Sequence, residues 1–286
     1  MRHAWVGRKR LQSAMEYLMT YGWAILAIAI VMVSLYSLGI FNAGSLQPTA
    51  NPGACEVVRT AAQASLAGQC SSLVPKYVGR FNGQNSYILT PYVHVSSSTL
   101  TASAWVDLNS VGGNMGIVGQ GRGGTDSWEF KTNGASYDFV VYTIKDYNFG
   151  TVTSGSYVFL TAVYSSGNVY LYVNGSQVMS YSGGPSVPIS LPLYIGYAPS
   201  DGGAGPWYLN GTISNIQVYN TSLDNASVKA LYLEGIGGTP IDPVHIVGWW
   251  PLNGNANDYS GNNDQGTQTN MIWDANWQSR YAAPTT

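Results

Sequence analysis

Glycoside hydrolysis needs two carboxyl groups about 5–10 Å apart across the sugar, and this sequence offers few candidates. The chain has four glutamates, Glu16, Glu56, Glu129 and Glu234. No two of them are spaced i, i+2 or i, i+4, so no pair shares one face of a strand or helix. The three histidines are isolated, and no Ser/His/Asp set is evident. We therefore expect no catalytic residues.

The segment "NGNANDYSGNND", residues 253–264, is rich in side-chain oxygen atoms. Carboxylate and amide oxygens on a glycine-rich loop are ligands that suit Ca²⁺. Asp258 is the first candidate ligand, with Asn253 and Asn257 beside it. The alternative is an Asn/Gly-rich turn whose side chains hydrogen-bond to its own backbone.

Two further segments combine glycine, aspartate and an aromatic residue: "VGQGRGGTDSWEF" and "APSDGGAGPWY". Tryptophans in such loops could stack on sugar rings, while charged side chains could hydrogen-bond to sugar hydroxyls. The alternative is that the aromatic residues belong to the core or its rim. The candidate ligand contacts are Arg122, Asp126, Trp128, Asp201 and Trp207.

The composition favours an extracellular β-rich protein. Charged residues make up 9% of the chain, against an average of about 25%. The 12 Lys and Arg residues form no basic stripe, so nucleic acid is not an expected partner. Four N-x-[ST] sequons are candidate glycan acceptors on an extracellular chain, at Asn174, Asn210, Asn220 and Asn225.

A membrane helix is predicted near the amino terminus. Arg8, Lys9 and Arg10 precede an uncharged run of 25 residues, Tyr17–Phe41. As a helix this run would be about 37 Å long, enough to cross a hydrocarbon layer of about 30 Å. The positive-inside rule places the amino terminus in the cytoplasm and the rest of the chain outside. Glu16 stands at the start of the run, where a carboxylate is costly to bury without a cation.

"QSAMEYL", residues 12–18, resembles the processing motif of archaeal type IV pilin precursors with a class III signal peptide. The resemblance implies a basic leader over residues 1–11, cleaved between Leu11 and Gln12 by a membrane prepilin peptidase. It also implies a transmembrane or filament helix over residues 12–41. The new amine at Gln12 would pair with Glu16 of a neighbouring copy as helices pack into a filament. The alternative is a permanent signal-anchor with Glu16 snorkelling to the interface.

Cys55 and Cys70 flank a short segment after the predicted helix. In an extracellular chain they are expected to form a disulfide worth about 3 kcal/mol; two free thiols are the alternative. Residues 42–75 are interpreted as a disulfide-closed stalk with a helical turn or two around residues 57–67. From residue 76 onward, period-two alternation with frequent turns predicts strands, for example over 100–108 and 157–164. Asn174-Gly175 predicts a type I′ hairpin.

Several segments, in order, resemble the laminin-G-like, concanavalin A-like jelly-roll family: "YVGRFNGQNSYI", "LTASAWV", "NVYLYVNGSQV", "LYIGYAP" and "LNGTISNIQVYNTSLDNASVKALY". The resemblance implies a mainly β jelly-roll sandwich over residues 76–236. It also implies a short helix at 223–232, capped by Asp224 or Asn225. The family often holds a structural calcium near a segment like 253–264. Related domains add an acid where this chain has Ser214 and Asn215.

The carboxyl-terminal segment, residues 237–286, contains "VGWWPLNGNANDYSGNNDQGT", which resembles the opening segment of the same family. We interpret this order as a circular permutation, in which residues 247–251 and about 266–273 return as strands that complete the sandwich. Trp249 and Trp250 would be costly to leave in water. A truncated second repeat, a loose tail, and a strand donated to a neighbouring copy are the alternatives.

These features predict a pilin-like surface subunit whose head binds an extracellular carbohydrate or cell-surface ligand. The expected location is the cell membrane with the head outside, or a filament of copies after processing. A monomeric membrane-anchored glycan-binding protein is the first alternative, and a surface glycan hydrolase is the second.

Overall fold

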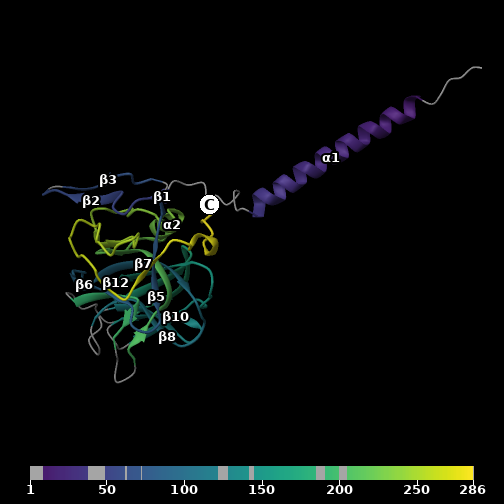
Figure 1. The fold of residues 1–286 in the computed structure, drawn as a ribbon. Helices are drawn as coiled ribbons and strands as arrows, with labels where there is room; N and C mark the ends of the chain where they lie inside the picture. Colours follow the sequence, from purple (N-terminus) through teal and green to yellow (C-terminus); the bar gives the residue numbers. More distant parts are fainter. Residues whose placement is uncertain are drawn as a thin grey trace, which may run out of the picture. The chain divides into compact units, whose positions relative to one another are not determined.

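The computed structural model describes residues 9–37, 49–61, 63–71, 73–121, 128–141, 145–184, 191–199 and 205–285 (Figure 1). The chain divides into two compact units, Met1–Leu46 and Gln47–Thr286.

The first unit contains one long helix, α1 (Lys9–Ser37). A helix over residues 12–41 was predicted, of which residues 38–41 lie outside the described part, as do residues 1–8 of the leader. Leu11, Gln12 and Glu16 belong to α1, but their side chains also lie outside the described part. Large apolar side chains of α1 are exposed, with Trp23 at 71% and Val33 at 69%. Within the residues that the structure describes, no helix is both long and apolar enough to span a membrane.

The second unit is a sandwich of two antiparallel sheets, which confirms the predicted jelly-roll class. The seven-stranded sheet has the order β11 (Lys145–Phe149), β10 (Ser136–Val141), β9 (Trp128–Asn133), β8 (Asn114–Gln120), β15 (Leu191–Ile195), β6 (Tyr87–Val93), β20 (Thr267–Thr269). The eight-stranded sheet has the order β14 (Ser176–Tyr181), β13 (Asn168–Val173), β12 (Val158–Ser165), β7 (Thr99–Leu108), β18 (Asn210–Tyr219), β5 (Val78–Asn82), β21 (Ile272–Asp274), with β19 (Ile246–Trp250) also paired to β18.

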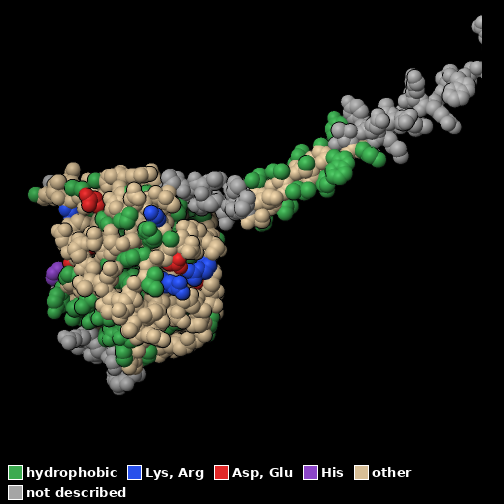
Figure 2. All heavy atoms as spheres, viewed as in Figure 1, with side chains coloured by type: hydrophobic (Ala, Val, Ile, Leu, Met, Phe, Trp, Pro, Cys, Tyr) green, Lys and Arg blue, Asp and Glu red, His purple; other side chains and the backbone are tan. Residues whose placement is uncertain are grey.

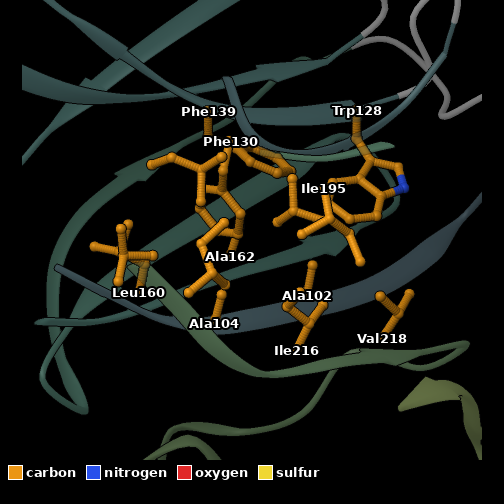
Figure 3. Packing of buried hydrophobic residues seen from close by; sticks show 14 of the residues in the cluster. Ala102, Ala104, Trp128, Phe130, Phe139, Leu160, Ala162, Ile195, Ile216 and Val218 are labelled. Carbon is orange, nitrogen blue, oxygen red and sulfur yellow. The ribbon is translucent and has the colours of Figure 1, made fainter. Parts of the chain in front are cut away.

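The main core lies between the two sheets (Figure 3). The seven-stranded sheet contributes large aromatic side chains, including Trp128, Phe130 and Phe139. The eight-stranded sheet faces them with small side chains such as Ala102 and Ala162. Alternation of large and small residues across the interface lets the two faces interdigitate at the density of a protein interior.

The carboxyl-terminal segment completes both sheets within the same chain. One side of β18 pairs with β5 over residues 210–213 and with β19 over residues 216–219. Farther along the chain, β20 pairs with β6 and β21 pairs with β5. Trp249 and Trp250 are 2% and 0% exposed. Without β19, half of one side of a central strand would have no backbone partner, which is costly for buried peptide groups.

A second layer covers the outer face of the eight-stranded sheet (Figure 1). It contains the hairpin of β2 (Cys55–Arg59) and β3 (Ala64–Gly68), the helix α2 (Asn225–Leu233) and the tail around the 3₁₀ turn η2 (Gln278–Arg280). These elements bury a cluster that includes Trp105, Trp249 and Trp277. Alternation over residues 100–108 predicts a strand with one buried face, but nine of the ten residues of β7 are buried, because the second layer covers its other face.

The predicted disulfide between Cys55 and Cys70 is present, with Cα atoms 5.0 Å apart. The helical turn expected at residues 57–67 is wrong, since this segment is a β-hairpin whose strands pair from Cys55↔Gly68 to Arg59↔Ala64. Cys55 and Val57 alternate toward the sandwich and are buried, while Glu56 is exposed. From residue 49 onward the predicted stalk is instead part of the second unit, because burial of this alternating apolar face stabilises it there.

Two local predictions are confirmed. Asn174 and Gly175 both have positive φ, 51° and 71°, and join β13 to β14 as a type I′ turn requires. The helix α2 begins after Asp224, whose side chain accepts a hydrogen bond from the Ser227 N–H at 2.8 Å. This contact satisfies one of the free N–H groups at the helix start.

Because the carboxyl-terminal segment packs into the sandwich, substitutions at its buried and exposed positions should lower the free energy of unfolding by different amounts. Trp250→Ala should lower the free energy of unfolding by about 3–5 kcal/mol, because it leaves a cavity in the main core. Ile272→Ala, in β21 and 60% exposed, should change it by less than about 0.5 kcal/mol. Urea denaturation of both variants measures the difference, and equal costs would contradict the packing described here.

Candidate functional site

The outer face of the seven-stranded sheet carries a row of polar and aromatic side chains. The strand register defines this face, because cross-strand partners point to the same side. Phe130 packs in the core, so its neighbours Glu129 and Lys131 point outward. Lys131 lies opposite Asp138 on β10, and Tyr194 on β15 lies opposite Gly119 on β8.

Two glycines of β8 make room on this face. A Cβ at Gly116 would lie 2.1 Å from the Ala198 backbone N, so only glycine lets β16 (Tyr197–Ala198) rest on the sheet. β16 pairs with β17 (Trp207–Tyr208). A Cβ at Gly119 would lie 2.8 Å from Cγ of Glu129. The glycines therefore let a two-stranded ribbon and a carboxylate pack close to the strand.

Aromatic rings line one half of the face. The centroid of the Tyr197 ring lies 5.4 Å from that of Tyr87, 5.3 Å from that of Tyr194 and 5.0 Å from that of Tyr208. All four rings are partly exposed. Burial, followed by the neighbouring tyrosines, raises the pKa of Tyr197 above its usual value. Its hydroxyl is therefore protonated at neutral pH and can both donate and accept a hydrogen bond.

Charged side chains line the other half. The Lys131 Nζ lies 3.6 Å from an oxygen of Asp138 and 3.7 Å from an oxygen of Asp146. The same ammonium lies 5.5 Å from the centre of the Trp207 ring, within cation–π range. The outer-face stripe is defined here as Tyr87, Tyr194, Tyr197, Tyr208, Trp207, Lys131, Asp138 and Asp146.

Burial raises the pKa of one carboxyl group in the stripe, that of Asp138. The Asp138 side chain is fully buried, while that of Asp146 is 48% exposed. Burial, and then the Asp146 charge, raise the pKa of Asp138 to about 6, and the Lys131 ammonium opposes this increase. Glu129 is 5% exposed and lines a shallow hollow together with Tyr194, Tyr197 and Pro199.

The sugar-contact predictions have mixed outcomes. Trp207 lies on the outer face in the stripe, partly exposed. Trp128 does not reach solvent: it is 0% exposed in the main core, where its Nε1 donates to Gln120 Oε1 at 3.0 Å. As a contact for a sugar ring Trp128 is therefore wrong, because the even positions of β9 face inward. Arg122, Asp126 and Asp201 lie outside the described residues.

The candidate calcium loop is organised by Asp258, which is 6% exposed. Its carboxylate accepts hydrogen bonds from the N–H groups of Trp249, Ser260 and Asp264 and from the Ser260 hydroxyl, at 2.8–3.0 Å. These contacts fit the alternative of a turn that bonds to its own backbone.

The other two proposed ligands have different surroundings. Asn253 accepts from the N–H of Tyr77 and donates to the carbonyl of Ala50, while Asn257 is exposed. Among the described residues, no group of three or more His, Cys, Asp or Glu side chains is placed to hold a metal ion. Calcium binding stays a prediction.

The four sequon asparagines differ in their surroundings. Asn174 accepts from the Phe159 N–H, Asn210 from the Asn109 side chain, and Asn220 from the Ser96 N–H. Asn225 is exposed at the first position of α2. Glycosylation of any of them stays a prediction.

Sequence reasoning missed most of the stripe. The predicted absence of a carboxylate pair rests on spacing along single strands, whereas Glu129 and Asp138 lie on neighbouring strands of one hairpin. The turn at Gly134, with φ of 61°, was the available signal. Folding "WEFKTNGASYDF" about that turn places Lys131 opposite Asp138. The tyrosines come from strands far apart in the sequence, and no local pattern joins them.

Comparison with known proteins identifies the family. Residues 82–229 of the 286-residue chain match the laminin-G-type family described as the concanavalin A-like lectin/glucanases superfamily. The chain belongs to this superfamily. A comparison with curated proteins finds no match.

Two solved structures share the fold. One is a candidate carbohydrate binding protein from Bacteroides ovatus, with 17% identity and a TM-score of 0.55 over 74% of this chain and 66% of that one. The other is a heptameric SAP-like pentraxin from Limulus polyphemus, with 14% identity and a TM-score of 0.53 over 69% of this chain and 94% of that one. This chain spans just under two thirds of the Bacteroides ovatus protein. At these identities the likeness concerns the fold alone.

The raised pKa of Asp138 predicts a pH-dependent stability. Its pKa is about 6 in the folded chain against 3.8 for the unperturbed group, and Asp264 shows a similar rise to about 6, mainly through burial. Between pH 4 and 6 the folded state binds more protons than the unfolded state. The contribution of these groups to stability is therefore greatest below pH 4, falls as pH rises to 6, and is constant above it.

Urea denaturation between pH 4 and 8 measures this dependence. Asp138→Asn should reduce the slope between pH 4 and 6, and Asp138→Asn combined with Asp264→Asn should reduce it further. An unchanged slope in the double variant would contradict the assignment of these two carboxyl groups.

Proposed function

We propose that this protein binds an extracellular saccharide through the outer-face stripe and does not hydrolyse it. The observation that carries this proposal is the juxtaposition of tyrosine rings, the Trp207 ring and carboxylates on one sheet face. Aromatic rings offer flat apolar surfaces with polar edges, and carboxylates accept hydrogen bonds from hydroxyl groups. A saccharide presents both complementary features, apolar ring faces and many hydroxyl donors.

The burial of two carboxylates on this sheet face, those of Glu129 and Asp138, argues for binding over hydrolysis. Glu129 is 5% exposed and Asp138 is 0% exposed. The ammonium of Lys131 lies beside the carboxylate of Asp138. A glycosidase acid and base must both reach the scissile bond from opposite sides. Carboxylates this deeply buried are poorly placed for that geometry.

The surface of the second unit is consistent with such a role. The face drawn in Figure 2 carries few charged side chains, and most of it is formed by uncharged polar groups and backbone. Hydroxyl and amide groups of this kind can exchange hydrogen bonds with water for those with a hydrated sugar at low cost.

We further propose that α1 anchors the protein, first in a membrane and then, after processing, in a filament of copies. A helix with exposed apolar side chains all round is not expected to stand alone in water, so lipid or other helices must cover it. The sequence around Gln12 and Glu16 supports cleavage after Leu11 by a prepilin peptidase. A Gln12 amine could then neutralise Glu16 of the next copy. A static monomeric anchor is the alternative.

Saccharide binding is tested on the full chain in detergent with an array of neutral and acidic glycans. Trp207→Ala and Tyr197→Ala should each weaken binding of any ligand found by about tenfold or more, because each removes a central contact ring. Ile272→Ala, on the other sheet, is the matched control and should bind normally. If neither aromatic variant loses affinity, the stripe is excluded as the binding site. If the protein releases reducing ends from a glycan, the hydrolase alternative is restored.

Processing is tested by the intact mass of the protein isolated from its native cells. A mature chain that starts at Gln12 is expected. Glu16→Gln should then abolish filament assembly, since the Gln12 amine loses its counter-charge, while Glu56→Gln in the exposed part of β2 should assemble normally. A chain that keeps its leader, or equal assembly of both variants, would favour the static anchor.

A further inference from the structure

The tyrosines of the outer-face stripe form a cluster with Tyr197 at its centre. The ring centroids of Tyr87, Tyr194 and Tyr208 each lie 5.0–5.4 Å from that of Tyr197. These separations are comparable with the length of one sugar unit in a glycan chain. A chain that passes over the cluster can therefore place successive units against successive rings, each contact burying apolar area.

The four rings do not share a plane. The plane of the Tyr197 ring is inclined by 36° to that of Tyr87, by 52° to that of Tyr194 and by 43° to that of Tyr208. Because the central ring is inclined to every neighbour, no flat surface can lie against all four rings. The rings are partly buried against one another, so flattening the cluster would break ring contacts that stabilise it.

The backbone fixes these inclinations. Two of the rings stand on the strands β6 and β15 of the sheet, and the other two stand on the β16–β17 ribbon. The ribbon approaches β8 so closely that a Cβ at Gly116 would lie 2.1 Å from the backbone N of Ala198. The Gly196 N–H also donates to the carbonyl of Ile117 on β8 at 2.7 Å. The ring inclinations are therefore preorganised before any ligand binds.

The Trp207 ring offers a ligand one face at most. The Nζ of Lys131 lies over the ring, 5.5 Å from its centre. The same ammonium lies 3.6 Å from the fully buried carboxylate of Asp138, which would lose its counter-charge if the lysine moved away. One face of the indole thus stays covered, and a ligand can stack only on the other face.

We infer that the outer-face stripe takes a single saccharide chain, with successive units against successive rings, and not the flat face of a crystalline polysaccharide. This inference rests on the proposed saccharide-binding function. In a single chain, rotation about the glycosidic bonds lets neighbouring units be inclined to one another, as the tyrosine rings are. In a crystal face, packing against adjacent chains holds the sugar rings flat, so inclined aromatic rings bury little apolar area against it.

The experiment compares forms of the same polymer. Hexasaccharides and disaccharides of cellulose, chitin, mannan and amylose are titrated into the full chain in detergent and followed by calorimetry. Adsorption to the crystalline polymers is measured by co-sedimentation. For any polymer that is recognised, the hexasaccharide should bind at least about tenfold more tightly than the disaccharide, because it reaches more rings. The crystalline form should retain no more of the natural chain than of Tyr197→Ala.

Three variants assign the dependence on chain length to the cluster. Tyr197→Ala removes the central ring and should reduce the ratio of hexasaccharide to disaccharide affinity to about threefold or less. Tyr208→Ala removes a peripheral ring and should also reduce this ratio, so the result does not depend on the folding of one variant. Ile272→Ala, on the other sheet, is the matched control and should keep the ratio of the natural chain.

The outcomes separate this inference from the proposed function. Adsorption to a crystalline polymer that is lost in Tyr197→Ala, without binding of its hexasaccharide, would overturn the inference and keep the saccharide site. Equal affinities for hexasaccharide and disaccharide would also overturn it, since they would indicate recognition of a chain end. A ratio unchanged in both tyrosine variants would do the same. If no form of any polymer binds, the proposed function fails, and the inference fails with it.

Discussion

The backbone of β18 needs a partner along its whole length, and this requirement organises the second unit. β5 covers only one half of one side of β18, so β19 must return from the carboxyl-terminal segment to cover the other half. The same return buries Trp249 on one face of the sheet and Trp250 on the other. Residues 83–245 lie between β5 and β19, the two strands that share this side of β18, so folding of the sandwich depends on non-local contacts.

The two sheets differ in what covers their outer faces, and that difference locates the candidate site. The eight-stranded sheet is covered by the β2–β3 hairpin, α2 and the tail, whose aromatic cluster around Trp105 and Trp277 is apolar. The Cys55–Cys70 bridge closes this cover. The seven-stranded sheet has instead the small β16–β17 ribbon and a stripe of tyrosines and carboxylates. One face is thus covered by apolar packing, and the opposite face carries the stripe to which we assign the proposed binding.

Charge on the exposed face is arranged around one buried acid. Asp138 loses hydration, and Lys131 at 3.6 Å lies just beyond usual hydrogen-bond length, so compensation is incomplete and the pKa rises to about 6. Attraction to the Asp138 carboxylate keeps the Lys131 ammonium in place. The neighbouring Trp207 ring is held in turn by its contact with the ammonium. Electrostatics and aromatic packing on this face are therefore coupled through a single side chain.

Features that depend on near neighbours could be read from the amino-acid order alone. Asn174-Gly175 predicts its turn because both residues tolerate positive φ, Asp224 predicts the start of α2, and alternation predicts the strands of the sandwich. The bridge between Cys55 and Cys70, which is present, was expected from a predicted extracellular location of this segment. By contrast, the segment at residues 57–67 was predicted as helix and is a hairpin, because burial of Cys55 and Val57 against the sandwich outweighs local preference. Tertiary structure alone decided that Trp128 faces the core and that Tyr87, Tyr197 and Lys131 share a surface, since their strands meet only once the two sheets have formed.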